Sequence, residues 1–310
     1  MEALTTSELL SRTYPKQDLI GGGILGYQSK LCIAAPPKVG KTFLAIQLAF
    51  EVAGGRPFLE TFEVDKPLKV YYLQMEVAEK EFQKRIRRMG RLYSDTEFYS
   101  LSMKPIKLDT TRGQHFLAEE LEECKADVLV IDPLARVHTR DENDMGEMGK
   151  LLAYFDRLIY DLRLSMVLIH HTRKIGFEER NLTRDSALKM QWMRGTSDLM
   201  GWVDGGVIME KKKEDVRLLS FDLRNAPNPQ PLKLIQDTDF LNWKTVGGFN
   251  NLMEGILGTG SLSKGELLKE IRADGLSLDK ARGIVDQALK GGILEEIRGE
   301  KNLREIRVKR

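Results

Sequence analysis

The stretch Leu31-Cys-Ile-Ala-Ala-Pro-Pro-Lys-Val-Gly-Lys-Thr42 decides the fold. Its first five residues are apolar and predict a buried strand, and residues 42–53 predict a helix that begins directly after the loop. In that position the main-chain N–H groups of the loop would converge on phosphate at the positive end of the helix. We therefore expect a nucleotide to be bound by Pro37, Lys38, Val39, Gly40, Lys41, Thr42 and Phe43.

The composition of this loop limits its chemistry. Ala35 stands where a phosphate loop usually has its first glycine, and Pro36 and Pro37 have no N–H, so only the second half of the loop can donate. Lys41 is expected to reach the β- and γ-phosphates, and the Thr42 hydroxyl to hold Mg²⁺. The alternative interpretation is a helix start with an incidental lysine, which the strand before it and the helix after it disfavour.

Outward from the loop, short apolar runs alternate with helical stretches as far as residue 235. Strands are predicted at 31–35, 69–75, 128–131, 166–170, 206–210, 216–222 and 232–235. Helices are predicted at 79–90 and 149–163, the second with apolar side chains on one face. This alternation predicts an α/β fold with a mostly parallel sheet flanked by helices.

Two carboxylates follow predicted strands. Asp132 ends the run 128–131, which predicts a magnesium ligand; the alternative is an aspartate that caps the turn at Pro133. Glu76 follows the strand 69–75, where a carboxylate can orient the water that attacks the γ-phosphate. Its negative charge could equally stabilise the positive N-terminus of the next helix, and strand order alone leaves both roles open.

His170 and His171 close another predicted strand. Adjacent residues of a strand point to opposite faces, so the pair is poorly suited to chelate one metal ion. From the residues alone, the better hypothesis is a hydrogen-bonded core histidine beside an exposed one. The chain has only two cysteines, which cannot build a disulfide framework.

Taken together, these segments resemble RecA-like ATPases over about residues 19–243, and among them the hexameric plasmid RepA-type replicative DNA helicases. The resemblance rests on the phosphate loop followed in order by Gln74-Met-Glu76, Val130-Ile-Asp-Pro-Leu-Ala-Arg136, Asp141-Glu-Asn143, Ile169-His-His-Thr-Arg-Lys174 and Arg194-Gly-Thr-Ser197. It implies a ring of subunits with ATP at each interface. It also implies that Glu76 is the catalytic carboxylate and that His170 senses the γ-phosphate.

Arg224 lies in Asp222-Leu-Arg-Asn-Ala-Pro227, which is similar to an Arg-Asn-x-Pro segment of replicative helicases. In those proteins the arginine reaches the ATP of the neighbouring subunit, so the resemblance implies that Arg224 is a catalytic arginine finger. A solvated strand-end arginine is the alternative, and Arg217 is the second candidate for the finger.

The loops 136–143 and 172–194 follow the Asp132 and His170 strands, and in RecA-like rings such loops face the central channel. The second carries six basic and three acidic residues, which suits contact with a phosphate backbone. The expected DNA-binding residues are Arg173, Lys174, Arg180, Arg184 and Lys189. Phe177 and Trp192 are its only aromatic side chains, and a solvated lid is the alternative.

After a glycine-containing linker at 244–250 the pattern changes. Helices predicted at 252–257, 263–273 and 278–290, then strands at 293–297 and 304–308, indicate a small winged helix-turn-helix. The predicted domains are therefore 1–245 and 246–310. Residues 298–310 hold six basic and two acidic residues, which favours a wing that contacts the phosphates of DNA. Binding to another protein is the alternative.

The composition agrees with this class of protein. The chain has 310 residues, 42% of them apolar and 30% charged, which excludes a membrane or fibrous protein. No run approaches a membrane span and the first residues are polar, so a cytoplasmic or nucleoid-associated protein is expected. The net charge of +2 means that binding to a polyanion would depend on local basic patches.

We therefore predict an ATPase, with ATP and Mg²⁺ as cofactors, that works as a homo-oligomeric, hexameric motor on single-stranded DNA. The most specific prediction is a replicative helicase of a plasmid, phage or mobile element, with a primase or an initiator protein as candidate partner. Two alternatives stay open: a RecA-like recombinase or filament ATPase, and a regulator whose ATP site switches a DNA-binding winged helix.

Overall fold

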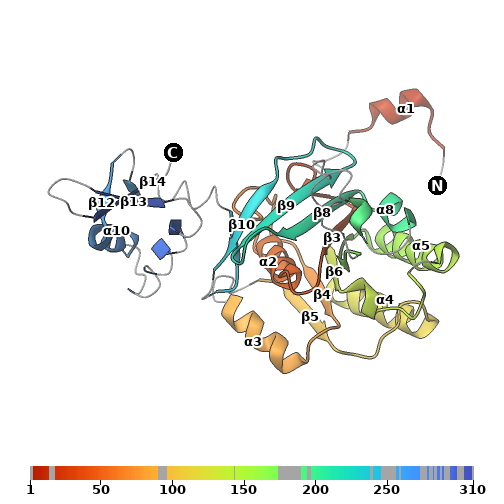
Figure 1. Ribbon diagram of the computed structural model, residues 1–310. Helices are drawn as coiled ribbons and strands as arrows, with labels where there is room; N and C mark the ends of the chain where they lie inside the picture. Colours follow the sequence, from red (N-terminus) through yellow and green to blue (C-terminus); the bar gives the residue numbers. More distant parts are fainter. Residues whose placement is uncertain are drawn as a thin grey trace.

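The computed structural model describes residues 3–13, 18–89, 96–142, 144–173, 190–193, 197–237, 240–245, 256–257, 260–272, 278, 282, 285–286, 288–289, 294–298 and 304–308. Its centre is a nine-stranded sheet (Figure 1). In spatial order its strands are β11 (Trp243–Thr245), β10 (Leu232–Gln236), β9 (Val216–Leu223), β8 (Gly205–Lys211), β3 (Lys30–Ala35), β7 (Ser165–His171), β6 (Val128–Asp132), β4 (Val70–Gln74) and β5 (Phe98–Ser102).

The sheet is parallel from β5 to β8 and antiparallel from β8 to β11. In the parallel part Ala35 pairs with His171, and Gln74 pairs with Asp132. Because parallel strands end at one edge, the phosphate loop, Glu76, Asp132 and His171 all follow or finish strands at the same carboxyl edge. This α/β sheet confirms the fold class predicted from the sequence.

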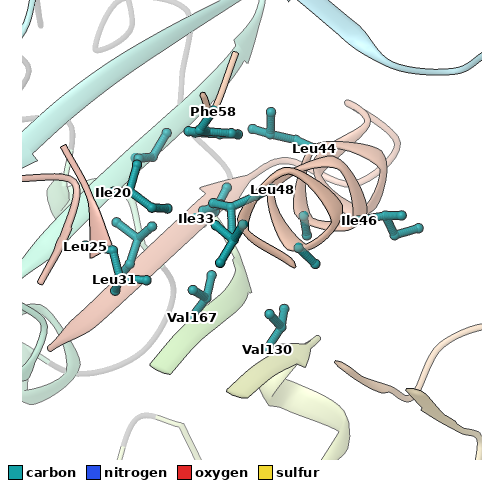
Figure 2. Packing of buried hydrophobic residues seen from close by; sticks show 14 of the residues in the cluster. Ile20, Leu25, Leu31, Ile33, Leu44, Ile46, Leu48, Phe58, Val130 and Val167 are labelled. Carbon is teal, nitrogen blue, oxygen red and sulfur yellow. The ribbon is translucent and has the colours of Figure 1, made fainter. Parts of the chain in front are cut away.

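Helix α2 (Lys41–Ala53) covers one face of the sheet and is buried on almost every side. Figure 2 shows Leu48 of α2 beside Ile33 of β3 and Leu44 next to Phe58, with Val130 and Val167 from the strands β6 and β7 below them. Helix α3 (Glu79–Met89) adds Phe82 and Met89 to the same cluster. The phosphate loop therefore stands on a rigid base, because the strand before it and the helix after it belong to one core.

The other face carries α4 (Thr111–Cys124), α5 (Met145–Leu162) and α8 (Ser197–Trp202). The face predicted for α5 is correct, since Leu151, Phe155 and Leu158 are buried there. Its start is four residues earlier than expected, because the Asp144 side chain caps the helix by accepting from Glu147 N–H at 3.0 Å. The short segment η3 (Met190–Trp192) lies on the same face, and η2 (Leu134–Arg136) follows β6.

Two further pieces flank the large sheet. The N-terminal helix α1 (Thr6–Ser11) precedes a small hairpin of β1 (Asp18–Ile20) and β2 (Leu25–Gly26). Beyond the large sheet, β12 (Leu262–Ser263), β14 (Arg304–Val308) and β13 (Leu294–Arg298) form a three-stranded antiparallel sheet with α10 (Lys264–Ile271). Most of the predicted helix 278–290 lies outside the described residues, so the winged helix and the domain boundary stay predictions.

None of the helices that the structure describes is long and apolar enough to cross a membrane.

Candidate functional site: a phosphate loop and its surroundings

The phosphate loop has the backbone that anion binding requires. Lys38 and Gly40 have left-handed conformations, with φ of 62° and 106°, and α2 begins at Lys41. The first bond of α2 runs from Leu44 N–H to the Gly40 carbonyl at 3.2 Å. The N–H groups of Lys41, Thr42 and Phe43 therefore precede the helical ladder and are available to a ligand.

Gly40 is held against Trp243 of β11. A Cβ atom added at Gly40 would lie 2.5 Å from Cζ2 of the Trp243 ring. Trp243 is itself fixed, because its N–H donates to Gln47 Oε1 at 2.6 Å and its carbonyl accepts from Gln47 Nε2 at 2.9 Å. The phosphate loop thus packs against β11, the edge strand of the large sheet, whose Trp243 lies 203 residues after Gly40 in the sequence.

Lys41 points toward His171. The two side chains meet at 3.3 Å between Nζ and Nδ1, and Lys41 is only 5% exposed. Burial lowers the pKa of Lys41, and the nearby charges of Asp132 and Glu76 oppose that effect. Burial and then the charge of Lys41 lower the pKa of His171, which favours a neutral ring whose Nδ1 accepts from the ammonium group.

Asp132 is buried at the end of β6, with 1% exposure. Its Oδ2 accepts from the Tyr72 hydroxyl at 2.7 Å, and the Thr42 hydroxyl also donates to the carboxylate. Burial raises the pKa of Asp132, while these two hydrogen bonds and the charge of Lys41 oppose the rise. Among the described residues Oδ1 has no hydrogen-bond partner, so a hard cation between Asp132 and Thr42 would satisfy it.

Glu76 lies on the turn between β4 and α3, and its side chain is exposed to the cavity. The turn is fixed by Gln74, whose Oε1 accepts from Glu76 N–H and from Val77 N–H, the latter at 2.8 Å. The Gln74 amide also donates to the Val77 carbonyl at 2.5 Å. A buried amide therefore sets the direction in which the Glu76 carboxylate projects.

These groups surround one cavity of about 490 Å³. It is lined by Pro37, Lys38, Val39, Gly40, Lys41, Thr42, Phe43, Glu76, Val77, Arg85, His171, Arg217 and Gln236. All seven residues predicted to bind the nucleotide are in this set, together with Glu76. Four of the lining side chains are basic and one is acidic, as expected of a site for a polyanion.

Arg217 at the start of β9 supports the same loop. Its Nε donates to the Val39 carbonyl at 2.8 Å, and its Nη1 donates to the Glu214 carbonyl at 2.9 Å. The guanidinium also lies 5.4 Å from the centroid of the Trp243 ring. Arg217 thus belongs to its own chain's nucleotide cavity, which argues against its use as the finger for a neighbour.

The resemblance gives the γ-phosphate-sensing role to His170, but His170 is not among the residues that line the cavity. His170 is 1% exposed and pairs with Ala34 of β3, whereas His171 lines the cavity. The side chains of β7 alternate between the two faces, so a shift of one residue exchanges the buried and the site-facing histidine. Of the two histidines, it is therefore His171 that faces the cavity.

Arg224 lies far from this cavity. It follows β9, which is antiparallel to β8, so it stands near Gly205 at the amino edge of the parallel strands. The six residues of β3 separate the two edges by about 20 Å, at about 3.3 Å per residue. Its Nη1 lies 3.5 Å from Asp204 Oδ1, and its Nη2 donates to the Gly201 carbonyl.

Of the expected DNA-binding residues, only Arg173 is described. It is exposed, and its N–H donates to the Trp192 carbonyl at 2.7 Å, beside the bridge between Thr172 and Met193. These contacts bring the two ends of the predicted loop together. Trp192 is 2% exposed in the core, so it is not available for base stacking. Lys174, Arg180, Arg184 and Lys189 lie outside the described residues.

Several residues of the site were missed by the sequence analysis. Arg85, Gln236 and Trp243 carry no motif, and they reach the loop from α3, β10 and β11 only after the chain has folded. Gln74 gave a local signal, because a polar side chain at the end of an apolar strand is unusual inside a core.

Comparison with known proteins identifies the class of the site. The family model described as AAA domain matches residues 1–176. A DnaB-like replicative helicase, solved with attention to its interactions with primase, has a TM-score of 0.57 and 12% identity, over 77% of this chain and 66% of that one. A KaiC-like protein from Pyrococcus horikoshii OT3 has a TM-score of 0.50 and 9% identity, over 74% of this chain and 99% of its own. At these identities the two structures show a common fold.

Proposed function

The chain belongs to the AAA domain family and is an ATPase with a RecA-like fold, and from this premise we propose that it is a hexameric motor on single-stranded DNA. The finer proposal is a replicative DNA helicase of a plasmid, phage or mobile element, working in the cytoplasm, where ATP and replicating DNA occur. A primase or an initiator protein is a candidate partner.

The polar groups in and around the cavity can each be given a step in hydrolysis. The N–H groups at the start of α2 and the Lys41 ammonium bind the phosphates, and Thr42 and Asp132 would hold magnesium. Magnesium supplies charge neutralisation of the phosphates when it is bound. Glu76 orients the attacking water and accepts its proton, and Gln74 holds the turn on which Glu76 projects. His171 contacts Lys41 and is placed to respond to the γ-phosphate.

One observation carries the oligomeric part of the proposal. Hydrolysis by this class of site is strongly accelerated by an arginine that stabilises charge on the transferred phosphoryl group. Arg224 is exposed, yet it stands at the opposite edge of the sheet from its own phosphate loop. Since it cannot reach that loop, Arg224 could act as an arginine finger only at the site of a second copy.

The DNA part rests on the predicted loop 172–194. Arg173 lies at its base, just after β7, whose last residue is His171. Arg173 is thus only two residues from His171, which lines the nucleotide cavity. The small C-terminal sheet, with Arg304 and Arg307 on β14, is a second candidate for contact with DNA.

The deciding experiment measures ATP hydrolysis by the purified full chain with and without single-stranded oligonucleotide, together with displacement of one strand from a forked duplex. We expect DNA-stimulated hydrolysis, and strand displacement that stops in Lys41→Ala. Hydrolysis that is indifferent to DNA, without displacement, would exclude the motor and leave only the ATPase.

A second function is supported by Trp243. This residue contacts the phosphate loop and lies in the last strand of the large sheet, so nucleotide binding can act on the chain that leads to the C-terminal elements. The protein would then be a regulator whose ATP site switches DNA binding. Binding to one duplex sequence that changes with ATP, without strand displacement, would favour the regulator over the motor.

A further inference from the structure

Arg85 contributes a cation to the nucleotide cavity from outside the phosphate loop. It lies on α3, nine residues after Glu76, and its half-buried side chain lines the same cavity as Lys41 and Thr42. Its guanidinium carbon is 5.2 Å from the centroid of the Phe43 ring. Because Phe43 directly follows Thr42 in α2, this contact places Arg85 beside the start of the helix that receives the phosphates.

The stacked position leaves the hydrogen-bonding edges of Arg85 available. A guanidinium that rests on an aromatic ring still directs its five N–H donors outward in its own plane. Within the described part of the chain, Arg85 makes no ion pair and no hydrogen bond, although Glu79 and Glu81 lie on the same helix. Glu81 is instead paired with Lys84 at 2.7 Å.

The other basic side chains of the cavity are placed differently. Arg217 donates to main-chain carbonyls of its own chain, and Lys41 contacts His171. Lys38 lies on the exposed part of the loop. Arg85 is therefore a basic group that faces the cavity and whose donors are not used by the described residues.

We propose that Arg85 is a phosphate ligand supplied by the same chain, which binds the nucleotide and ties α3 to it. The inference rests on the proposed ATP site and adds a specific residue to it. It also gives α3 a function, because the helix that follows Glu76 then carries a ligand of the phosphates.

The test measures equilibrium binding of ATP, ADP and AMP to Arg85→Ala. Charge-assisted hydrogen bonds of this kind predict about 10- to 100-fold weaker binding of ATP. Binding of AMP is expected to change much less, because it has fewer phosphates. Arg85→Lys keeps the charge without the fork and should fall between the wild type and Arg85→Ala. Arg87→Ala is the control, since Arg87 is exposed on the same helix and points away from Arg85.

Three results would overturn the inference: an affinity of Arg85→Ala for ATP within twofold of the wild type, an equal loss for all three nucleotides, or an equal loss in Arg87→Ala. Thermal unfolding of each variant shows whether the fold is kept. Failure of the motor proposal looks different, because the wild type would then still bind ATP but would not respond to DNA.

Discussion

At the scale of single residues, Gly40 carries the strictest requirement. Its φ of 106° is one that side chains rarely adopt, and the Trp243 ring occupies the space of a Cβ atom. Gly40→Ala should destabilise the protein by about 1–3 kcal/mol and weaken ATP binding, because the loop must shift away from the ring. Denaturant unfolding and nucleotide binding would measure the two effects.

The control for this substitution is Gly149→Ala. Gly149 lies inside α5 with no atom near the position of a Cβ, so alanine should be neutral or stabilise the helix by up to about 1 kcal/mol. A Gly40→Ala protein as stable as the wild type, with unchanged ATP affinity, would show that Trp243 does not constrain the loop.

The histidine pair shows what sequence can predict about single residues. The sequence shows a polar residue at the end of each of these strands, and in the structure those residues lie at one edge of the sheet. Which of two adjacent side chains faces the cavity depends on the register of β7 against β3, where Ala35 pairs with His171. A sequence pattern without a register cannot supply that information, and the role of His170 was expected only from the resemblance to the helicases.

At the scale of elements, the turn after β4 places Glu76. Gln74→Ala removes the acceptor of two N–H groups, so Glu76 should lose its fixed position while the phosphate loop stays intact. We expect kcat to fall about 10- to 100-fold, with the affinity for ATP little changed. Steady-state kinetics that determine kcat and KM for ATP separately would measure both effects.

Gln83→Ala, on the exposed face of α3, is the matched control and should keep the wild-type kcat. If Gln74→Ala changed KM and left kcat unaltered, Gln74 would contribute to binding and would not position the carboxylate.

The elements that were predicted and those that were missed differ in burial. Strands β3, β4, β6 and β7 are covered on both faces and appear in the sequence as continuous apolar runs. The edge strand β5 is only partly buried, so its alternation with polar residues was too weak to detect. Helix α4 was missed because it buries only Gly113, Leu117 and Leu121 completely.

At the scale of the whole molecule, the proposal divides the catalytic site between two copies of the chain. Lys41→Ala should abolish hydrolysis, and Arg224→Ala should abolish it while ATP stays bound. Mixed together, the two inactive proteins should recover activity, because a site then combines one copy's Lys41 with another copy's Arg224. With random mixing and independent sites, about one quarter of the sites are complete.

The mixing experiment needs a measure of assembly. The mass of the particles with ATP and oligonucleotide should match that of the wild type, and it also distinguishes a closed ring from a filament. Full hydrolysis by Arg224→Ala in the assembled state, or an inactive mixture of correctly assembled variants, would refute the role of Arg224.

The two edges of the large sheet, one with the phosphate loop and one with Arg224, also limit the symmetry of any active assembly. Contacts between unlike edges join copies head to tail, and such a row has a first and a last member. In an open filament, the phosphate loop of the terminal subunit has no neighbouring Arg224. A closed ring has no terminal subunit, so it is the arrangement in which every phosphate loop has an arginine from its neighbour.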